Sequence, residues 1–201
     1  MATYLLVHGA DQSEHIWDSV APLLREQGHQ VFCPNMTSIK KTTLQHNIDE
    51  VSQFILDNKL TDFILVGHSY ASMVVTGVLD KFDADIRAMV YIDSVVPKPG
   101  KSLRDMFSDL GFDYVKDFNL TLDQPVITPV YFDEQKLIRK PKAYIHCLRS
   151  GFKAISQPFY EMMVNADHKH WLYFDLYAPH NCMETHPKEL AVILLGLNDL
   201  K

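Results

Sequence analysis

The chain has 201 residues, of which 47% are hydrophobic and 22% are charged, and its formal net charge at pH 7 is −6. This length and composition are typical of one ordinary globular domain, and the negative charge argues against nucleic acid or an anionic membrane as the main partner. No apolar run approaches the roughly 18 residues that cross a membrane, and no basic segment precedes the first apolar run, so we expect neither a membrane span nor a signal peptide.

Strands and helices are expected to alternate over most of the chain. Short apolar runs bounded by turn residues predict six buried strands, at about residues 4–7, 31–33, 63–66, 88–92, 143–148 and 171–174. Apolar residues at helical spacing predict helices at residues 14–27, over about fifteen residues after Thr42, from Met73 behind the third strand, near residues 103–110 and 157–165, and from residue 184 or 187 to residue 197.

Residues 97–140 break this alternation and hold six prolines or glycines. Alternating strands and helices predict a parallel sheet with helices on both faces, and ligands bind at the carboxyl ends of such strands. The irregular stretch leaves from the carboxyl end of the fourth strand, so it should lie over that edge as a small cap. We therefore expect a single α/β domain over residues 1–201, with a six-stranded, mostly parallel sheet and a cap insert at about residues 97–140.

The third strand leads into a motif for a catalytic nucleophile. Residues 67–71 read Gly-His-Ser-Tyr-Ala, one residue away from the G-x-S-x-G pattern of a nucleophile elbow. That pattern needs small residues around the serine, because the sharp turn brings strand and helix close together. The order of strand, turn and helix is the one that the motif requires, so Ser69 is the candidate nucleophile.

A serine hydroxyl needs a base, and the base needs an orienting group behind it. His180 follows the sixth strand, where a loop can reach over the carboxyl edge of the sheet, and His186 is the alternative base. The loop after the fifth strand is the usual place for the acid and contains no carboxylate. Asp93, which ends the fourth strand beside the nucleophile strand, is the natural substitute, while Asp175 and Ser150 remain open as alternatives.

Backbone N–H groups that receive the oxyanion are also expected. In enzymes with a nucleophile elbow on a parallel sheet, these N–H groups come from the residue after the nucleophile and from the loop after an early strand, here the first. Here those residues are Tyr70 and Ala10, the latter following His8 and Gly9.

We expect no metal and no other cofactor. Asp167, His168 and His170 precede the sixth strand, at the opposite edge of the sheet, and lack the spacing of a complete ligand set. The three cysteines are widely spaced and form no disulfide or metal pattern, which favours reduced thiols in the cytoplasm.

Five segments of the sequence form one joint pattern. They are Val7-His8-Gly9-Ala10 with Trp17, Gly28-His29 with Val31, Ile64-Leu65-Val66-Gly67-His68-Ser69, Val90-Tyr91-Ile92-Asp93 with Val96-Pro97, and His180 with Pro187-Lys188-Glu189-Leu190-Ala191. This pattern resembles the α/β-hydrolase subfamily that holds plant methyl esterases, hydroxynitrile lyases and many small bacterial esterases, over nearly the whole chain except the cap. The resemblance matches Ser69 to the nucleophile, His180 to the base, and Ala10 and Tyr70 to the oxyanion donors. In the plant members an aspartate follows the fifth strand, near the position of Ser150 here.

We therefore expect a serine hydrolase that cleaves a small, largely apolar carboxylic ester, thioester or lactone through an acyl-enzyme at Ser69. Its partner would be the small-molecule substrate, with no nucleic acid and no membrane, and the sequence leaves room for a homodimer. Aromatic residues of the cap region are expected to line an apolar pocket: Phe107, Phe112, Tyr114, Phe118, Tyr131 and Phe132.

Two other functions are weighed against this one. A binding protein without catalysis is suggested by Ala71 in the elbow and by the missing carboxylate after the fifth strand. A hydroxynitrile lyase is disfavoured, because the resemblance implies a threonine in place of Gly9 and a lysine directly after the histidine, where this chain has Asn181.

Overall fold

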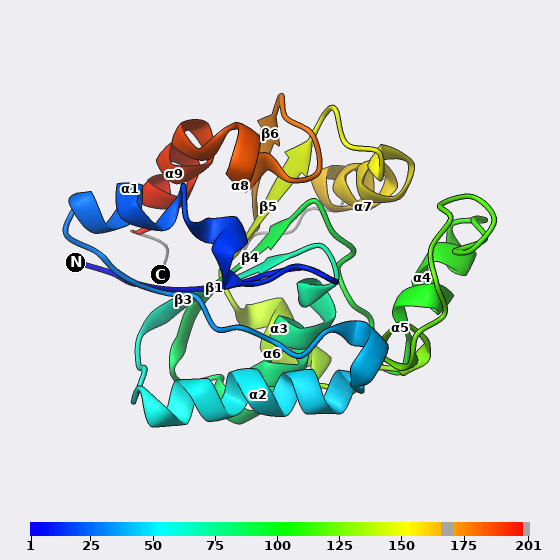
Figure 1. Cartoon of the computed structure of the whole chain (residues 1–201), viewed down its shortest axis with the longest axis horizontal. Coiled ribbons are helices and arrows are strands. Elements are labelled where there is room, and N and C mark those ends of the chain that lie inside the picture. Colours follow the sequence, from blue (N-terminus) through cyan, green and yellow to red (C-terminus); the bar gives the residue numbers. More distant parts are fainter. Residues whose placement is uncertain (166–170, 199–201) are drawn as a thin grey trace.

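Six parallel strands form the centre of the molecule (Figure 1). The computed structural model describes residues 1–165 and 171–198. Along the sheet the strands lie in the order β2-β1-β3-β4-β5-β6, and every neighbouring pair is parallel. Their bounds are Thr3–Val7 (β1), Gln30–Phe32 (β2), Phe63–His68 (β3), Ile86–Ile92 (β4), Lys142–Cys147 (β5) and Trp171–Leu176 (β6). The predicted six-stranded α/β architecture is confirmed.

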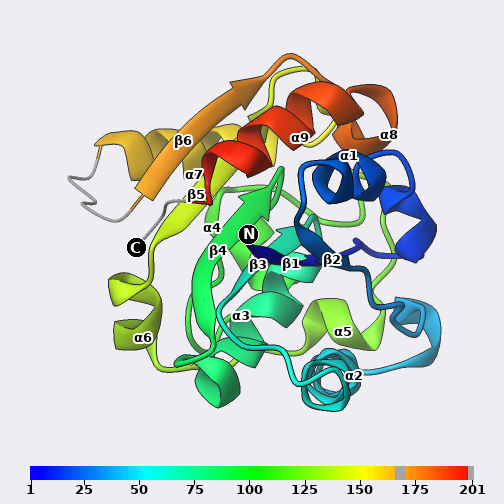
Figure 2. The same cartoon turned by 90° about the vertical axis from the view of Figure 1, so that its left-hand side faces the viewer.

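Helices cover both faces of this sheet (Figure 2). One face carries α1 (Ala21–Glu26) and α9 (Pro187–Gly196), and the other carries α2 (Leu44–Asp57) and α3 (Ala71–Phe82). The other helices are α4 (Leu103–Asp109), α5 (Gln124–Ile127), α6 (Glu134–Arg139), α7 (Lys153–Asn165) and α8 (Cys182–Thr185), with 3-10 turns η1 (Glu14–Trp17) and η2 (Ile39–Lys41). Across the described part of the chain, no helix is both long and apolar enough to cross a membrane.

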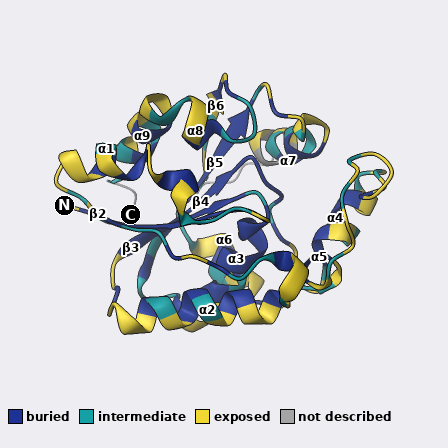
Figure 3. Ribbon diagram, in the orientation of Figure 1, coloured by how far each residue is buried: buried dark blue, intermediate teal, exposed yellow. Residues whose placement is uncertain are grey.

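The hydrophobic core has two parts, one on each face of the sheet. Successive side chains of a strand point to opposite faces, so Tyr4 and Leu6 pack with α1 and α9, while Leu5 and Val7 pack with α2 and α3. The central strands are consequently buried on both sides (Figure 3). This double burial explains why their sequences are continuous apolar runs rather than alternating ones.

Prolines stand in the first turn of two helices that the sequence predicts. Residues 14–27 form the 3-10 turn η1 and then the separate helix α1, with Pro22 in the first turn of α1. A proline lacks the N–H that would continue a helix but is tolerated in a first turn, so it marks a new start. For the closing helix, the start predicted at residue 187 is confirmed, since α9 begins at Pro187, and residue 184 belongs to the separate short helix α8.

The stretch predicted as a cap contains α4, α5 and α6. Helix α4 begins with a capping box, in which Ser102 and Asp105 each accept a backbone N–H of the other. Helices α4 and α5 lie together at one side of the molecule (Figure 1). Helix α6 instead packs against α3, where Lys136 Nζ lies 3.4 Å from Asp80 Oδ1. The last part of the predicted cap therefore belongs to the helical layer on that face.

Gly77 allows α2 and α3 to approach each other closely. A Cβ placed on Gly77 would lie 2.3 Å from Cδ1 and 2.9 Å from Cγ1 of Ile48 in α2. Both distances are far below van der Waals contact, so an alanine here would force the Ile48 side chain out of its place between the two helices.

We expect Gly77→Ala to destabilise the fold by about 1–2 kcal/mol, although alanine is the better helix former by about 1 kcal/mol. Urea denaturation of the single variants and of a Gly77→Ala/Ile48→Val double variant measures this. Because valine lacks Cδ1, the double variant should be more stable than the sum of the two single losses predicts. A Gly77→Ala variant more stable than the natural chain would contradict the packing argument.

Candidate active site

Ser69 stands on the turn between β3 and α3. Its φ is +55°, a left-handed conformation that few residues other than glycine adopt, and its N–H donates to Ile92 O of β4 at 3.1 Å. A Cβ on Gly67 would lie 2.8 Å from Val75 Cγ2 and 3.1 Å from the backbone oxygen of Ala71. The glycine predicted from the elbow pattern is therefore required by its contacts, and the fully buried Ala71 occupies the place of the second glycine.

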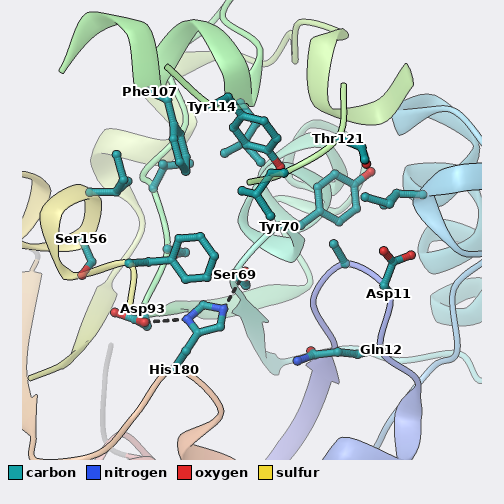
Figure 4. Close-up of a pocket in the computed structure, with 18 residues that line it drawn as sticks. Asp11, Gln12, Ser69, Tyr70, Asp93, Phe107, Tyr114, Thr121, Ser156 and His180 are labelled. Atoms are coloured by element: carbon teal, nitrogen blue, oxygen red, sulfur yellow. Dashed lines mark hydrogen bonds and ion pairs between the residues drawn. The ribbon is translucent and has the colours of Figure 1, made fainter. Parts of the chain in front are cut away.

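Three side chains from distant parts of the sequence meet at this turn (Figure 4). His180 Nε2 lies 3.0 Å from Ser69 Oγ, and His180 Nδ1 lies 2.6 Å from Asp93 Oδ2. A carboxylate can only accept a hydrogen bond, so the proton of the neutral imidazole sits on Nδ1. Nε2 then has a free lone pair directed at the hydroxyl of Ser69.

The backbone fixes the position of Asp93 at the end of β4. Its N–H donates to Ile145 O of β5 at 2.9 Å, and its φ of +42° is one that aspartate tolerates better than most residues. The Asp93 side chain is fully buried, whereas that of His180 is 20% exposed. The contact expected between the carboxylate after β4 and the histidine is present.

The alternatives that the sequence left open have other partners. Ser150 Oγ accepts the N–H of Phe152 at 3.0 Å. Asp175 Oδ1 lies 3.3 Å from His146 Nδ1, and the ring of His186 bonds the hydroxyl of the preceding residue at 2.8 Å. The structure thus brings Ser69, His180 and Asp93 together, while the three alternatives are bonded elsewhere.

Metal-ligating side chains do not gather in the part of the chain that the structure describes. No group of three or more His, Cys, Asp or Glu residues there could hold a metal ion. Asp167, His168 and His170, whose spacing was considered above, lie outside the described residues.

The turn after β1 (residues 8–12) brings Ala10 to the same place; we call it the oxyanion turn after the role that the sequence predicts for Ala10. His8 Nε2 accepts the N–H of Met36 at 3.0 Å, so His8 carries its proton on Nδ1, which donates to Gly9 O at 2.8 Å. In a trans peptide the C=O and N–H point in opposite directions, so this bond turns the N–H of Ala10 away from His8. Among the turn and loop hydrogen bonds of the described residues, none uses the N–H of Ala10 or of Tyr70.

A cavity of about 220 Å³ opens onto these groups. Ser69, His180, Asp93, Ala10 and Tyr70 all line it. The rest of its wall is mostly apolar and includes Ile39, Val95, Leu103, Phe107, Tyr114, Leu120, Phe152 and Ile155.

The predicted aromatic lining is right for two residues and wrong for four. Phe107 and Tyr114 line the cavity. Phe118 instead packs edge-to-face on Phe107, and Phe112 edge-to-face on Phe118, with ring centroids 5.2 and 5.7 Å apart. Two more are directed elsewhere: Phe132 is buried in the core, and Tyr131 is 75% exposed in another surface hollow. The prediction rested on the presence of these six aromatic residues in the cap region. The direction of each side chain depends on how α4 and the loops around it fold, which composition does not show.

Two further histidines are buried beside the site and bear on its electrostatics. Burial lowers the pKa of His8, and burial together with the neighbouring His180 lowers the pKa of His68 well below its usual value. The His68 ring lies 4.5 Å from that of His180, and its Nε2 is 3.1 Å from the backbone oxygen of His180. Both buried rings are therefore neutral near pH 7.

Sequence reasoning missed the residues that hold these groups in place. Tyr70 OH donates to Asn47 Oδ1 at 3.0 Å, and Gln12 Nε2 donates to Asn181 Oδ1 at 3.0 Å. Asn47 lies on the apolar side of α2, and a polar residue on that side was a signal that could have found it. Gln12 carries no comparable signal, because it lies in an irregular turn.

Comparison with known proteins agrees with the fold. Residues 4–194 match the model of the Alpha/beta hydrolase family. The chain is 40% identical over 111 residues to a carbendazim hydrolyzing esterase of Nocardioides sp. (strain SG-4G), a match that covers 51% of this chain and 46% of that protein. It is 24% identical over 162 residues to methylesterase 10 of Arabidopsis thaliana, covering 72% and 58% respectively. The chain thus spans about half the length of the curated relatives it matches.

A solved structure gives the same result for the fold. An extracellular α/β-hydrolase from a Paenibacillus species superposes with a TM-score of 0.77 over 98% of each chain, at 20% sequence identity. At that identity the likeness shows the fold alone.

The buried histidines predict how stability depends on pH. Because the folded chain disfavours protonation of His8 and His68, the unfolded state binds more protons once the pH falls below about 6.5. We expect the free energy of unfolding to decrease as the pH is lowered from about 7 to 5, as measured by urea denaturation. His68→Gln should reduce this dependence, and His46→Gln, on the exposed side of α2, is the control. If the free energy of unfolding of His68→Gln depends on pH as strongly as that of the natural chain, His68 is not the source of the dependence.

Proposed function

The chain belongs to the α/β-hydrolase family, and on that basis we propose that it hydrolyses small, largely apolar carboxylic esters through an acyl-enzyme on Ser69. The observation that carries this proposal is the continuous hydrogen-bonded series from Ser69 Oγ through His180 to Asp93, at 3.0 and 2.6 Å. A serine with an acceptor nitrogen at hydrogen-bond distance, and with a carboxylate behind that ring, is the arrangement that activates a hydroxyl.

The proposed acylation begins when Ser69 Oγ attacks the ester carbonyl carbon. Its proton passes to His180 Nε2, and the buried carboxylate of Asp93 stabilises the imidazolium that forms. The negative charge on the carbonyl oxygen is received by the N–H groups of Ala10 and Tyr70. His180 then gives its proton to the departing alcohol oxygen, and the acyl group remains on Ser69.

Deacylation repeats these steps with water. His180 takes a proton from the water as its oxygen attacks the acyl carbon, and the same two N–H groups receive the second oxyanion. The proton returns to Ser69 Oγ as the acyl bond breaks. The products are a carboxylic acid and the alcohol, and Ser69 is restored.

The cavity supports a small and uncharged substrate. Its volume of about 220 Å³ is below the range of roughly 300–1,000 Å³ that drug-sized ligands occupy. Its lining, among the described residues, includes the carboxylates of Asp11 and Asp93 and no lysine or arginine. A substrate with a carboxylate of its own would meet no compensating charge there. A thioester or a lactone of the same size would fit the same chemistry.

The carbendazim-hydrolyzing and methylesterase relatives are consistent with esters as the substrate class. A lyase reaction that releases an anion is less well supported, because the residue after the base is the neutral Asn181. Its side-chain amide is bonded to Gln12 and Glu184, so no cation would receive the leaving group from this position.

We expect Ser69→Ala to lower kcat for p-nitrophenyl acetate or butyrate by about 10⁴-fold or more. The variant should also lose labelling by a fluorophosphonate probe, which forms a covalent bond with an activated serine. Ser72→Ala, one turn along α3, is the matched control and should keep both activities. Turnover and labelling that survive in Ser69→Ala would refute the acyl-enzyme, and a natural chain that shows neither would favour a binding protein.

We expect Asp93→Asn to lower kcat by about 10⁴-fold, by analogy with the same substitution in serine proteases. The amide keeps the shape of the carboxylate but can present N–H to Nδ1 and so favours the wrong tautomer of His180. Asp175→Asn is the matched control, since Asp175 bonds to His146, and it should cost less than about tenfold. A larger loss in Asp175→Asn than in Asp93→Asn would reverse the assignment of the acid.

A further inference from the structure

We propose that Gln12 is a positioning residue that couples the oxyanion turn to the loop carrying the base. That second segment, which we call the base loop, comprises residues 177–181 between β6 and α8. Gln12 Oε1 accepts the N–H of Gly9 at 2.9 Å, and Gln12 Nε2 donates to Asn181 Oδ1 at 3.0 Å. One amide thus joins two segments that are 169 residues apart in the sequence, and it does so at the wall of the cavity (Figure 4).

The direction of each hydrogen bond in this series is fixed by Glu184. Its carboxylate can only accept, so the amide nitrogen of Asn181, 3.1 Å away, must face it. The oxygen of Asn181 is then directed at Gln12, which must present its own nitrogen. The oxygen of Gln12 is left for the N–H of Gly9, so the series runs from Gly9 to Glu184 with every donor matched to an acceptor.

This series holds the oxyanion turn from one side while His8 holds it from the other. Gly9 has no side chain and would otherwise rotate freely about its φ and ψ angles. Gln12 fixes the N–H of Gly9, and His8 Nδ1 fixes the C=O of Gly9 at 2.8 Å. With both peptides beside Gly9 held, the direction of the Ala10 N–H is set before any substrate arrives.

The same side chain supports the base loop. Asn181 directly follows His180, so its bond to Gln12 limits movement of the base. Gln12 Oε1 also lies 3.2 Å from His68 Nδ1, and His68 Nε2 lies 3.1 Å from the backbone oxygen of His180. The neutral ring of His68 has one N–H, which can donate either to Gln12 Oε1 or to the backbone oxygen of His180. In the first case His68 is bonded to Gln12, and in the second it is bonded to the base loop.

The inference rests on the proposed function, because it assigns the two groups that Gln12 holds to the oxyanion and to the base. Both matter most in the transition state, where charge develops on the substrate oxygen and on His180. Loss of the coupling should therefore lower kcat and leave KM nearly unchanged.

The test begins with Gln12→Met, which has a similar length and no hydrogen-bonding amide. We expect kcat for p-nitrophenyl butyrate to fall by about 10- to 100-fold, less than the loss of an entire oxyanion donor, with KM within about threefold. Gln53→Met, on an exposed position of α2, is the matched control and should leave both constants unchanged. A Gln12→Met variant with kcat within about twofold of the natural chain would overturn the proposal.

A second pair of variants tests the direction of the hydrogen bonds. Gln12→Glu keeps the acceptor for Gly9 but places a carboxylate against Asn181 Oδ1, which Glu184 prevents from turning. Adding Glu184→Gln lets the amide of Asn181 turn around, so that its nitrogen donates to the new carboxylate at position 12 and its oxygen accepts from the new amide at position 184. The bond from the N–H of Gly9 keeps its direction. We expect the double variant to recover at least about fivefold in kcat over Gln12→Glu, which carries the same new charge. A double variant no better than the single one would mean that Gln12 does not act through Asn181.

Amide hydrogen exchange measured by NMR separates failure of this inference from failure of the proposed function. In Gln12→Met, exchange at Gly9, whose N–H donates to Gln12 Oε1, should become at least about tenfold faster, while exchange in the central strands stays unchanged. If the natural chain hydrolyses no ester and binds no serine probe, the proposed function fails, and this exchange still decides whether the coupling exists. Unchanged exchange at Gly9, or an equal increase throughout the chain, would contradict a local coupling.

Discussion

The register of the three central strands is the constraint on which the rest of the structure depends. β1 and β3 pair in parallel as far as Val7 and Gly67, and β3 and β4 as far as His68 and Ile92. The three strands therefore end at one level, and the residues after them emerge side by side at the edge of the sheet. The oxyanion turn, Ser69 and Asp93 are brought together by backbone pairing alone, before any contact between their side chains. A slip of one residue would turn every side chain of a strand to the opposite face.

Backbone strain is concentrated at that edge. Six residues other than glycine have a positive φ within the described ranges, and three of them, Asp11, Ser69 and Asp93, line the cavity. The conformation costs about 1–2 kcal/mol for most residues and less for aspartate, so Ser69 bears the largest share of this strain. The doubly buried sheet offsets this cost, because neighbouring strands hold the backbone of Ser69 and Asp93 through hydrogen bonds to Ile92 and Ile145. Strain of this kind commonly gathers at sites that perform chemistry.

The sequence was most informative where local pattern and strand order decide the outcome. Continuous apolar runs predicted all six strands, and the adjacency of β3 and β4 made Asp93 the expected partner of His180. The direction in which a side chain points in the folded structure was not predictable in the same way. Tyr131 and Phe132 are neighbours with the same composition signal, yet one is exposed and the other is buried. The amide of Gln12 depends on Asn181 and Glu184, which no local pattern connects to it. The roles of Ser69, His180 and Asp93 in catalysis are proposals that rest on their geometry.

The base loop explains how the proposed acid, Asp93, can come from β4 rather than from the loop after β5. The chain after β5 is bonded to the end of β6 and to the base loop, because the N–H groups of Leu148 and Arg149 donate to Leu176 O and Ala178 O at 2.9 and 3.0 Å. Phe152 packs its ring against that of His180, with centroids 4.7 Å apart. The chain after β5 therefore supports the histidine by backbone bonds and ring packing, and no carboxylate is needed there. The proposed chemistry requires only that acid, base and nucleophile meet at the end of β3. A parallel sheet can supply the acid from either of two adjacent strands, because their ends are about 4.8 Å apart, provided that the base loop is held across β5.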